Sequence, residues 1–509
     1  MTAAGHVTRH DVAVDSDDYD RRLIAEVHPA SWTNPTPNGR YNLVVIGGGT
    51  AGLVSAVGAA SLGARVALVE RHWLGGDCLN YGCVPSKALI RAARAAHDVR
   101  TANELGIQTG EPRVDFAAVM LRMRRLRAAI APHDSAHRLA GLGIDVYLGD
   151  ARFVARDAIV VDGVRLVFAR AVIATGGRAA MPTVPGLAEL APLTNETVFS
   201  LTELPRRLLV IGGGPIGCEL AQAFVRFGSE VTIIERGDRL LPREDRDAST
   251  IIEAQLVREG ITLVLGAKIV GAARTDQAYT VTFERHGSTE HSTGDAILVA
   301  AGRTPNIDGL GLELADVTAS KRGIDVDDHL RTTNRRIYAV GDVASRFQFT
   351  HAADAMARIV IQNALFFGRK RASALVMPWC TYTDPEVAHV GLYEQQAKAQ
   401  GGDVTTLTAQ LADNDRAVLD GETIGFGRVH VDRKGRLLGA TLVARHAGES
   451  IGEASVALTA KLTIGALSSA IHPYPTQAEV WKRLGDAYQA RRLTPRVRSV
   501  FQWLMRRRR

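Results

Sequence analysis

Two of the four cysteines lie five residues apart, in the stretch GGDCLNYGCVPSK at residues 75–87. Such a pair can form a redox disulfide or bind a soft metal ion. Five residues of ideal helix separate Cα atoms by roughly 8–9 Å, whereas a disulfide requires about 4.4–6.8 Å. We therefore expect a break in the helix between Cys78 and Cys83, and Gly82 can adopt the unusual backbone conformation that a break needs. The alternative is two reduced cysteines that only pack.

The pattern GxGxxG follows a short apolar run twice in the chain. Its glycines are Gly47, Gly49 and Gly52 in the first copy and Gly212, Gly214 and Gly217 in the second. In each copy a helical pattern and a second apolar run lead to an acid, Glu70 or Glu235, which lies 23 residues after the first glycine. This combination predicts two dinucleotide-binding sites, whereas the alternative is two ordinary glycine-rich turns.

Each loop has a physical role in such a site. The glycines let the backbone approach a pyrophosphate, and the helix N-terminus supplies amide donors. Glu70 and Glu235 would accept hydrogen bonds from a ribose 2′-hydroxyl. A carboxylate at Glu235 repels a 2′-phosphate, which favours NADH, although Arg236 and Arg239 lie nearby and keep NADPH as an alternative. The cysteines follow the first loop by one βα unit, which predicts a redox enzyme that passes electrons from a flavin into a protein disulfide.

Three further segments are predicted to be strands that run into small-residue turns. They contain Thr175 and Gly176 at 171–177, Gly302 at 296–306, and Gly341 and Asp342 at 337–342. Asp342 ends its strand and is a candidate to hold the ribityl or phosphate end of a flavin. Taken singly, each segment is equally well explained as an ordinary loop.

The length of 509 residues predicts three or four domains. The composition is that of an ordinary globular protein, since 46% of the residues are hydrophobic and 23% are charged. The apolar run at 43–62 is interrupted by glycines, which favours a buried strand and helix over a membrane span. The polar first twenty residues do not resemble a secretory signal, and the few cysteines indicate a reducing compartment, so a cytoplasmic location is expected. The histidines show no spacing typical of a structural metal site.

The net charge of +7 comes from one segment. Residues 491–509 contain eight arginines and no acid, so the remainder of the chain carries −1. Nucleic-acid binding by the body of the protein is therefore not expected. Within this segment five apolar residues recur at helical spacing, namely Val497, Val500, Phe501, Leu504 and Met505. They predict an amphipathic helix that either packs on the protein itself or contacts an anionic membrane surface.

Together these features resemble the flavin-dependent pyridine nucleotide–disulfide oxidoreductases, over about residues 41–490. The resemblance implies an α/β fold, with two Rossmann-like domains for FAD and NAD(P) and a C-terminal α+β dimerisation domain. It also implies a homodimer whose active site spans both subunits. The expected boundaries are an N-terminal arm at 1–40, the FAD-binding domain at 41–185 and 310–375, the NAD(P)-binding domain at 186–309, the dimerisation domain at 376–490 and a basic amphipathic tail at 491–509.

Roles for individual side chains follow from the resemblance. Cys83 would be the thiol nearest the flavin and form the charge-transfer thiolate, and Cys78 would be the interchange thiol that faces the substrate. Lys87 would lie near flavin N5 and pair with Glu219, which follows the second glycine loop. The two other cysteines, Cys218 and Cys380, are expected to be structural.

The C-terminal stretch HPYPTQAE at residues 472–479 limits the classes of substrate that fit the chain. Members that act on glutathione or dihydrolipoamide have a His before Pro-Thr, five residues before a Glu, as an acid–base dyad. Here Tyr474 holds that position, with Glu479 five residues later, and His472 lies two residues too early although it could substitute. A phenol with a pKa near 10 is a poor proton shuttle.

A tyrosine at this position is similar to mercuric reductase, in which the thiols would bind Hg(II) as substrate. Cys78 and Cys83 would then be its ligands here. Two departures are the lack of a cysteine before residue 41 and of a cysteine pair near residue 509. We therefore predict a mercuric-reductase-like enzyme that takes electrons from NAD(P)H through FAD and the Cys78–Cys83 disulfide to an acceptor. The alternatives are an NADH:quinone or other electron-acceptor reductase at the membrane surface, a dihydrolipoamide dehydrogenase-like enzyme, and a flavin redox sensor.

Overall fold

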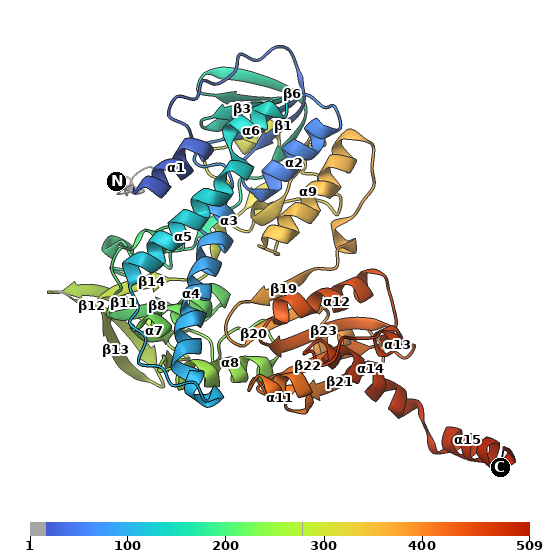
Figure 1. Ribbon diagram of the computed structural model, residues 1–509. Helices are drawn as coiled ribbons and strands as arrows, with labels where there is room; N and C mark the ends of the chain where they lie inside the picture. The colour runs from blue at the N-terminus through green and yellow to red at the C-terminus, as the bar shows by residue number, and fades with distance from the viewer. Residues whose placement is uncertain (1–16, 277, 509) are drawn as a thin grey trace. The chain divides into compact units, whose positions relative to one another are not determined.

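The computed structural model describes residues 17–276 and 278–508 (Figure 1). The chain divides into two compact units. Unit 1 comprises Met1–Arg236 and Gly260–Leu375, and unit 2 comprises Gly237–Glu259 and Val376–Arg509. The two predicted dinucleotide-binding domains therefore both contribute to unit 1, and each unit is described below by itself.

The first sheet of unit 1 carries the first glycine loop. Its strands run in the order β3-β2-β1-β6-β5-β4, and β18 also pairs with β6. Strands β1, β2, β3, β18 and the end of β6 are parallel, whereas β4, β5 and β6 form an antiparallel meander. The bounds are β1 Tyr41–Ile46, β2 Val66–Glu70, β3 Ile144–Leu148, β4 Ala151–Ala155, β5 Ala158–Val161, β6 Val164–Ile173 and β18 Ile337–Ala339.

Helices cover this parallel sheet and connect its strands. Helix α2, Thr50–Ser61, links β1 to β2, so the apolar run at 43–62 is a strand and a helix as predicted. The other helices near the sheet are α3 Gly76–Asn80, α4 Cys83–Thr101, α5 Phe116–Ile130, α6 Ala136–Gly141 and α9 Thr350–Leu365. Every residue of β1 except Asn42 is buried, as expected for a central parallel strand.

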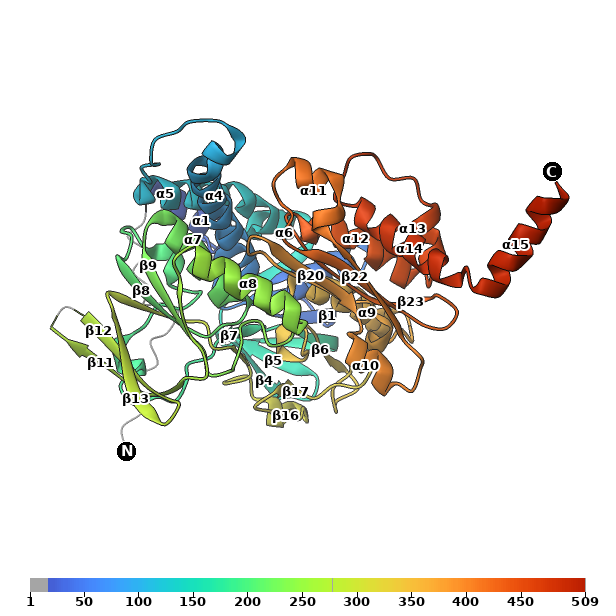
Figure 2. The same ribbon diagram turned by 90° about the horizontal axis from the view of Figure 1, so that it is seen from below.

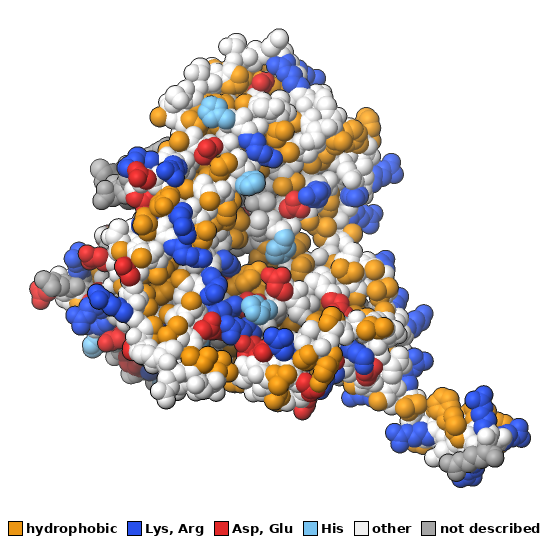
Figure 3. Space-filling view, in the orientation of Figure 1, with side chains coloured by type: hydrophobic (Ala, Val, Ile, Leu, Met, Phe, Trp, Pro, Cys, Tyr) orange, Lys and Arg blue, Asp and Glu red, His pale blue; other side chains and the backbone are white. Residues whose placement is uncertain are grey.

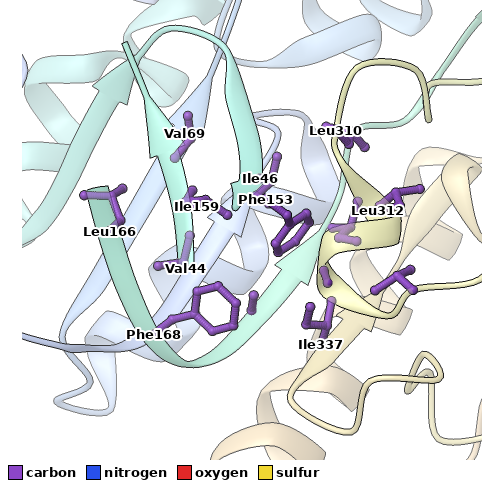
Figure 4. Packing of buried hydrophobic residues seen from close by; sticks show 14 of the residues in the cluster. Val44, Ile46, Val69, Phe153, Ile159, Leu166, Phe168, Leu310, Leu312 and Ile337 are labelled. Atoms are coloured by element: carbon purple, nitrogen blue, oxygen red, sulfur yellow. The ribbon is translucent and has the colours of Figure 1, made fainter. Parts of the chain in front are cut away.

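The core beneath the sheet holds large apolar side chains from distant segments. Val44 and Ile46 of β1, Phe153 of β4 and Phe168 of β6 pack together with Ile337 of β18 (Figure 4). Burial of each such side chain favours folding by roughly 1.5–3 kcal/mol. The chain thus returns at β18 to complete the sheet that it began at β1.

The second parallel sheet of unit 1 carries the second glycine loop. Its strands run in the order β10-β9-β8-β14, with bounds β8 Arg207–Ile211, β9 Glu230–Ile234, β10 Thr262–Val264 and β14 Ala296–Val299. Helix α7, Pro215–Phe227, links β8 to β9. An antiparallel sheet of β11 Lys268–Thr275, β12 Ala278–Arg285 and β13 Ser288–Gly294 lies between β10 and β14 in the sequence. Two βαβ sheets, each with its glycine loop, confirm the predicted pair of Rossmann-like domains.

The described part of the N-terminal arm, from residue 17, is attached to the first sheet domain. Helix α1, Asp18–Val27, begins at Asp17, whose side chain accepts hydrogen bonds from the amides of Tyr19 and Asp20 at 2.9 Å each. Asp20 is buried and pairs with Arg127 of α5 at 2.6 Å. Further along, the indole of Trp32 donates to the Val146 carbonyl at 3.1 Å. Residues 1–16 of the predicted arm lie outside the described residues.

Unit 2 is an antiparallel sheet covered by helices (Figure 2). Its strands run in the order β19-β20-β23-β22-β21. Their bounds are β19 Pro378–Thr381, β20 Glu386–Gly391, β21 Thr405–Gln410, β22 Phe426–Val431 and β23 Leu437–Ala444. The helices after residue 376 are α10 Glu394–Ala399, α11 Asp415–Leu419, α12 Ala447–Thr459, α13 Ile464–Ser469, α14 Glu479–Arg492 and α15 Pro495–Arg507. An antiparallel sheet combined with helices confirms the predicted α+β character of this domain.

The segment Gly237–Glu259 groups with unit 2 rather than with the sheet that precedes it. Buried Glu244 accepts hydrogen bonds from the Tyr393 hydroxyl at 2.6 Å and from the Trp379 indole at 2.8 Å. Arg428 of β22 pairs with Asp245 at 2.8 Å. The helix in this segment is α8, Arg246–Arg258. The expected domain at 186–309 therefore contains a stretch that is anchored on the C-terminal sheet.

Candidate active site

The two cysteines lie on either side of a break between helices. Cys78 belongs to α3, and Cys83 is the first residue of the 19-residue helix α4. Gly82 caps α4 with φ −129° and ψ −112°, and a Cβ there would lie 2.9 Å from the Asp77 carbonyl oxygen. The predicted break is therefore confirmed, and it brings the two thiols together.

The thiols are in contact and differ in acidity. In this structure both are unoxidised, and a hydrogen bond from Cys78 lowers the pKa of Cys83 to about 6, against the opposing effect of burial. The Thr350 hydroxyl, 3.3 Å from the Cys83 sulfur, and the charge of Lys87 lower it further. The pKa of Cys78 is raised by the same hydrogen bond and by burial. A position at a helix N-terminus also favours a thiolate, so Cys83 is the thiolate of the pair.

Lys87 connects the cysteine helix to the second nucleotide domain. Its ammonium lies 2.7 Å from the Glu219 carboxylate. Glu219 is buried on α7, directly after the second glycine loop, whereas Lys87 is one turn after Cys83 on α4. The structure thus brings together the three predicted residues Cys83, Lys87 and Glu219. Their roles in catalysis stay predictions.

The first glycine loop leaves no room for side chains at its first and third glycines. Gly47 has φ +106°, and a Cβ on Gly52 would lie 1.8 Å from the Gly47 carbonyl oxygen. Gly49 caps α2 without a side-chain hydrogen bond, so no side chain of the cap competes for the first amides of the helix. Glu70 accepts a hydrogen bond from the Gly48 amide at 2.6 Å. This cradle of glycines and helix amides fits a dinucleotide such as FAD.

The second glycine loop repeats this geometry. Gly212 has φ +112°, and a Cβ on Gly217 would lie 2.0 Å from the Gly212 carbonyl oxygen. A Cβ on Gly214 would meet nothing within 4 Å, so that position is open to a ligand. Glu235 accepts a hydrogen bond from the Gly213 amide at 2.6 Å. The fit for a second dinucleotide is therefore the same as for the first.

A buried arginine joins two acids beside the cysteine helix. Arg303 lies 3.2 Å from Asp342 and 3.1 Å from Asp77, the residue before Cys78. Burial raises the pKa of Asp342, and the Arg303 charge opposes that shift. Asn195 donates to the other oxygen of Asp77 at 3.0 Å. Sequence reasoning missed Asp77, Asn195 and Arg303 as site residues, because only their distant partners give them a role.

The small-residue turns form around this cluster. Gly176 has φ +65°, Gly302 has φ +119° and Gly341 has φ +76°, conformations that favour glycine. Thr175 donates its hydroxyl hydrogen to the Asn306 carbonyl at 2.7 Å. The turns predicted from 171–177, 296–306 and 337–342 are thus present as turns, and their contacts with a cofactor stay predictions.

In unit 2, Tyr474 is exposed and does not pair with Glu479. Its hydroxyl donates to Asp415 at 2.8 Å, and 70% of the residue is accessible. The Asp415 carboxylate is the main cause of a raised Tyr474 pKa. Glu479 begins α14, and its Oε2 atom is buried without a hydrogen-bond partner among the described residues. Tyr474 is therefore a neutral phenol across the physiological pH range.

His472 is engaged within its own domain. Its Nε2 atom lies 3.0 Å from Glu453 of α12, and its Nδ1 atom lies 3.1 Å from the Ala470 carbonyl. Both ring nitrogens therefore have partners, and a role in proton transfer would require one of these contacts to open. The pair is a His–carboxylate dyad that sequence spacing did not reveal.

The two remaining cysteines have surroundings typical of structural residues. Cys218 is fully buried on α7, and its thiol donates to the Gly213 carbonyl at 3.4 Å. Cys380 lies on β19 beside Glu386. Among residues 17–276 and 278–508, no group of three or more His, Cys, Asp or Glu side chains could hold a metal ion. In the same part of the chain no helix has both the length and the apolarity to cross a membrane.

Comparison with known proteins places this geometry in a family. Residues 41–357 match the family model for pyridine nucleotide–disulphide oxidoreductases, and residues 377–484 match the dimerisation domain of that family. The chain belongs to the pyridine nucleotide–disulphide oxidoreductases, which bind FAD and use NAD(P)H. The second match identifies the domain after residue 376 as a dimerisation domain and supports a homodimer.

Relatives in this family carry different names. A mercuric reductase of Lysinibacillus sphaericus is 36% identical over 469 residues, which cover 92% of this chain and 86% of that protein. A dihydrolipoyl dehydrogenase of Bacillus subtilis is 34% identical over 465 residues, covering 88% and 97%. Among solved structures, the HOCl-induced flavoprotein disulfide reductase RclA from Escherichia coli matches with a TM-score of 0.79 at 31% identity, covering 88% of this chain and 99% of RclA.

Proposed function

We propose that this flavoprotein reduces a soft metal ion, Hg(II), with electrons from NAD(P)H that pass through Cys83 and Cys78. Bound FAD supplies the chemistry that converts the hydride of NAD(P)H into an electron pair for the thiols. The observation that carries the proposal is the side chain at position 474. Tyr474, whose phenol donates a hydrogen bond to Asp415, occupies the sequence position at which a His would transfer protons during thiol exchange.

The choice of acceptor follows from proton balance. Reduction of a substrate disulfide consumes one electron pair in total and adds one proton to each of the two thiol products, so a protein acid must protonate the leaving sulfur. Reduction of Hg(II) to Hg(0) consumes an electron pair and no proton, so the hydride donor becomes NAD(P)⁺ and its proton is released. A neutral Tyr474 with a raised pKa is therefore adequate for the metal and inadequate for the disulfide.

The thiols are suited to a soft ion. Thiolates are the ligands that soft metal ions prefer, and Cys83 is a thiolate at neutral pH because its pKa is lowered to about 6. Cys78, half-buried beside it, releases its proton when it binds the metal. A Cu(II) complex of RclA exists among the similar structures, so a relative of this fold binds a metal ion.

NADH is the proposed donor. Glu235 lies at the second glycine loop with its carboxylate on the Gly213 amide, where it would meet the ribose. A carboxylate at that point accepts a hydrogen bond from a 2′-hydroxyl and repels a 2′-phosphate. Replacement Glu235→Ala should therefore improve use of NADPH relative to NADH, measured as the ratio of kcat/KM values.

The test is Hg(II)-dependent oxidation of NADH by the purified protein. We expect Hg(II) to stimulate turnover and Cys78→Ser to abolish the stimulation, while reduction of a quinone by the same variant persists. Cys218→Ser, at a buried thiol outside the pair, is the matched control and should retain the activity. Full metal activity in Cys78→Ser would refute a route through the two thiols.

A second candidate is thiol–disulfide exchange with a small dithiol. The observation in its favour is the contact of His472 with Glu453 at 3.0 Å, which is a His–carboxylate pair near Tyr474 in the sequence. Dihydrolipoamide-dependent reduction of NAD⁺ tests it. Turnover that is fast in the wild type and lost in His472→Gln would favour this candidate over the metal.

A further inference from the structure

Helix α15 follows α14 after a short connection and has no buried residue. Figures 1 and 2 both show it standing clear of the rest of unit 2. Its start is well defined, since Thr494 accepts a hydrogen bond from the Val497 amide at 3.4 Å and Pro495 occupies the first turn. One of the two predicted possibilities was that the apolar stripe of α15 packs on the protein itself. Within unit 2 the stripe does not do so.

One face of α15 is apolar and exposed. At about 100° per residue, its five stripe residues fall within an arc of about 140°. Their exposed fractions are Val497 36%, Val500 56%, Phe501 49%, Leu504 40% and Met505 56%. Such a continuous exposed apolar face on a helix is typical of an interaction site.

Arginines border this face on both sides. On the helical projection Arg496 and Arg507 lie next to one edge and Arg498 lies next to the other. Arg507 stacks on the ring of Trp503, with its guanidinium carbon 4.0 Å from the ring centroid. In Figure 3 hydrophobic and basic side chains share the visible face of α15. The sequence from residue 487 to 509 contains no acid that could neutralise these charges.

We propose that α15 binds the surface of an anionic lipid bilayer. An apolar arc bordered by arginines matches the interface of such a membrane, where acyl chains lie beneath negatively charged headgroups. Thirteen residues are too few to span a bilayer, so the helix lies in the plane of the interface. A contact between the α15 helices of two copies fits the segment less well, because the facing helix would present the same positive charge.

Vesicle cosedimentation with the full-length holoenzyme tests the proposal. We expect binding to vesicles of phosphatidylglycerol and phosphatidylcholine in equal parts, and at least about tenfold weaker binding to vesicles of phosphatidylcholine alone. Because each arginine near an anionic surface strengthens binding by roughly fivefold, Arg498→Gln and Arg507→Gln, which remove one arginine from each edge of the apolar face, should each weaken it by about that factor. Added salt should weaken it as well.

A matched pair of substitutions separates the apolar face from the charge. Phe501→Ser removes an aromatic ring from the arc and should weaken vesicle binding by about tenfold. Gln502→Ser, one residue along on the polar side, should leave binding unchanged. Both variants should retain the wild-type rate of NADH oxidation, because α15 is no part of the candidate active site; this activity also reports that they are folded.

Three results would overturn the proposal. The first is no binding to the mixed vesicles, and the second is equal binding to vesicles with and without phosphatidylglycerol. The third is a change of oligomeric state in Phe501→Ser, measured by analytical ultracentrifugation without lipid, which would make α15 a contact between copies of the chain. None of these results bears on the proposed metal reduction.

Discussion

Tyr474 donates its phenolic hydrogen to the Asp415 carboxylate at 2.8 Å. This hydrogen bond fixes the side chain at the position where the sequence resemblance implies a His in members that act on thiols. It also holds the phenol neutral, since the adjacent carboxylate raises the Tyr474 pKa. The choice between a metal ion and a disulfide as acceptor depends on this relationship.

Tyr474→Phe removes the hydroxyl and keeps the ring. If the phenol helps to hold the metal ion, kcat for Hg(II)-dependent NADH oxidation should fall by about tenfold, a loss of roughly 1.4 kcal/mol of transition-state stabilisation. Quinone reduction should not change, because it does not require a metal ligand. Steady-state kinetics with both acceptors measures the effect, and an equal loss with both would point to damage elsewhere in the protein.

The thiolate of Cys83 predicts a distinct pH dependence. Its pKa is lowered to about 6, so the thiolate persists at neutral pH and is lost as the pH falls through that value. In the reduced protein, the rate of alkylation at Cys83 by iodoacetamide should therefore decline below about pH 6. Lys87→Met removes a positive charge that lowers this pKa, so the midpoint should move to higher pH. An unchanged midpoint in Lys87→Met would contradict the assigned cause.

Two glycines of the second loop should respond differently to the same substitution. Gly217→Ala places a methyl group 2.0 Å from the Gly212 carbonyl oxygen and should destabilise the fold by about 1–3 kcal/mol. Gly214→Ala meets nothing within 4 Å and has an extended backbone, so stability should change by less than about 0.5 kcal/mol. If NADH approaches Gly214, KM for NADH should rise. Chemical denaturation and kinetics distinguish the two effects.

The N-terminal helix should contribute to stability through one buried ion pair. Asp20→Ala leaves the Arg127 guanidinium buried without its carboxylate and should cost about 3 kcal/mol in the free energy of unfolding. Asp18→Ala is the matched control on the same helix, because Asp18 is exposed and its removal should cost less than about 1 kcal/mol. Urea denaturation measures both, and similar losses would contradict the role given to Asp20.

Local sequence patterns predicted much of this site. The spacing of Cys78 and Cys83 required a helix break, and the structure has it at Gly82. Each glycine loop is flanked in the sequence by the strand, helix and acid of its site, so the two dinucleotide domains could be recognised without knowledge of the rest of the chain.

The residues that sequence reasoning missed act through long-range contacts. Thr350 at the start of α9 contacts Cys83, which lies 267 residues earlier, and Arg303 at the start of strand β15, Arg303–Pro305, pairs with Asp77 of α3. Neither residue belongs to a local sequence pattern, since a lone Thr or Arg can have many roles. The periodicity of α15 likewise predicted an apolar stripe but not the surface that this stripe contacts.

The central claim is that electrons pass through Cys83, and anaerobic titration with NADH tests it most directly. The account predicts a long-wavelength absorbance band at the two-electron stage, caused by the Cys83 thiolate against the flavin, and its loss in Cys83→Ser. Reduction of the wild-type flavin without such a band, or a band that persists in Cys83→Ser, would contradict it.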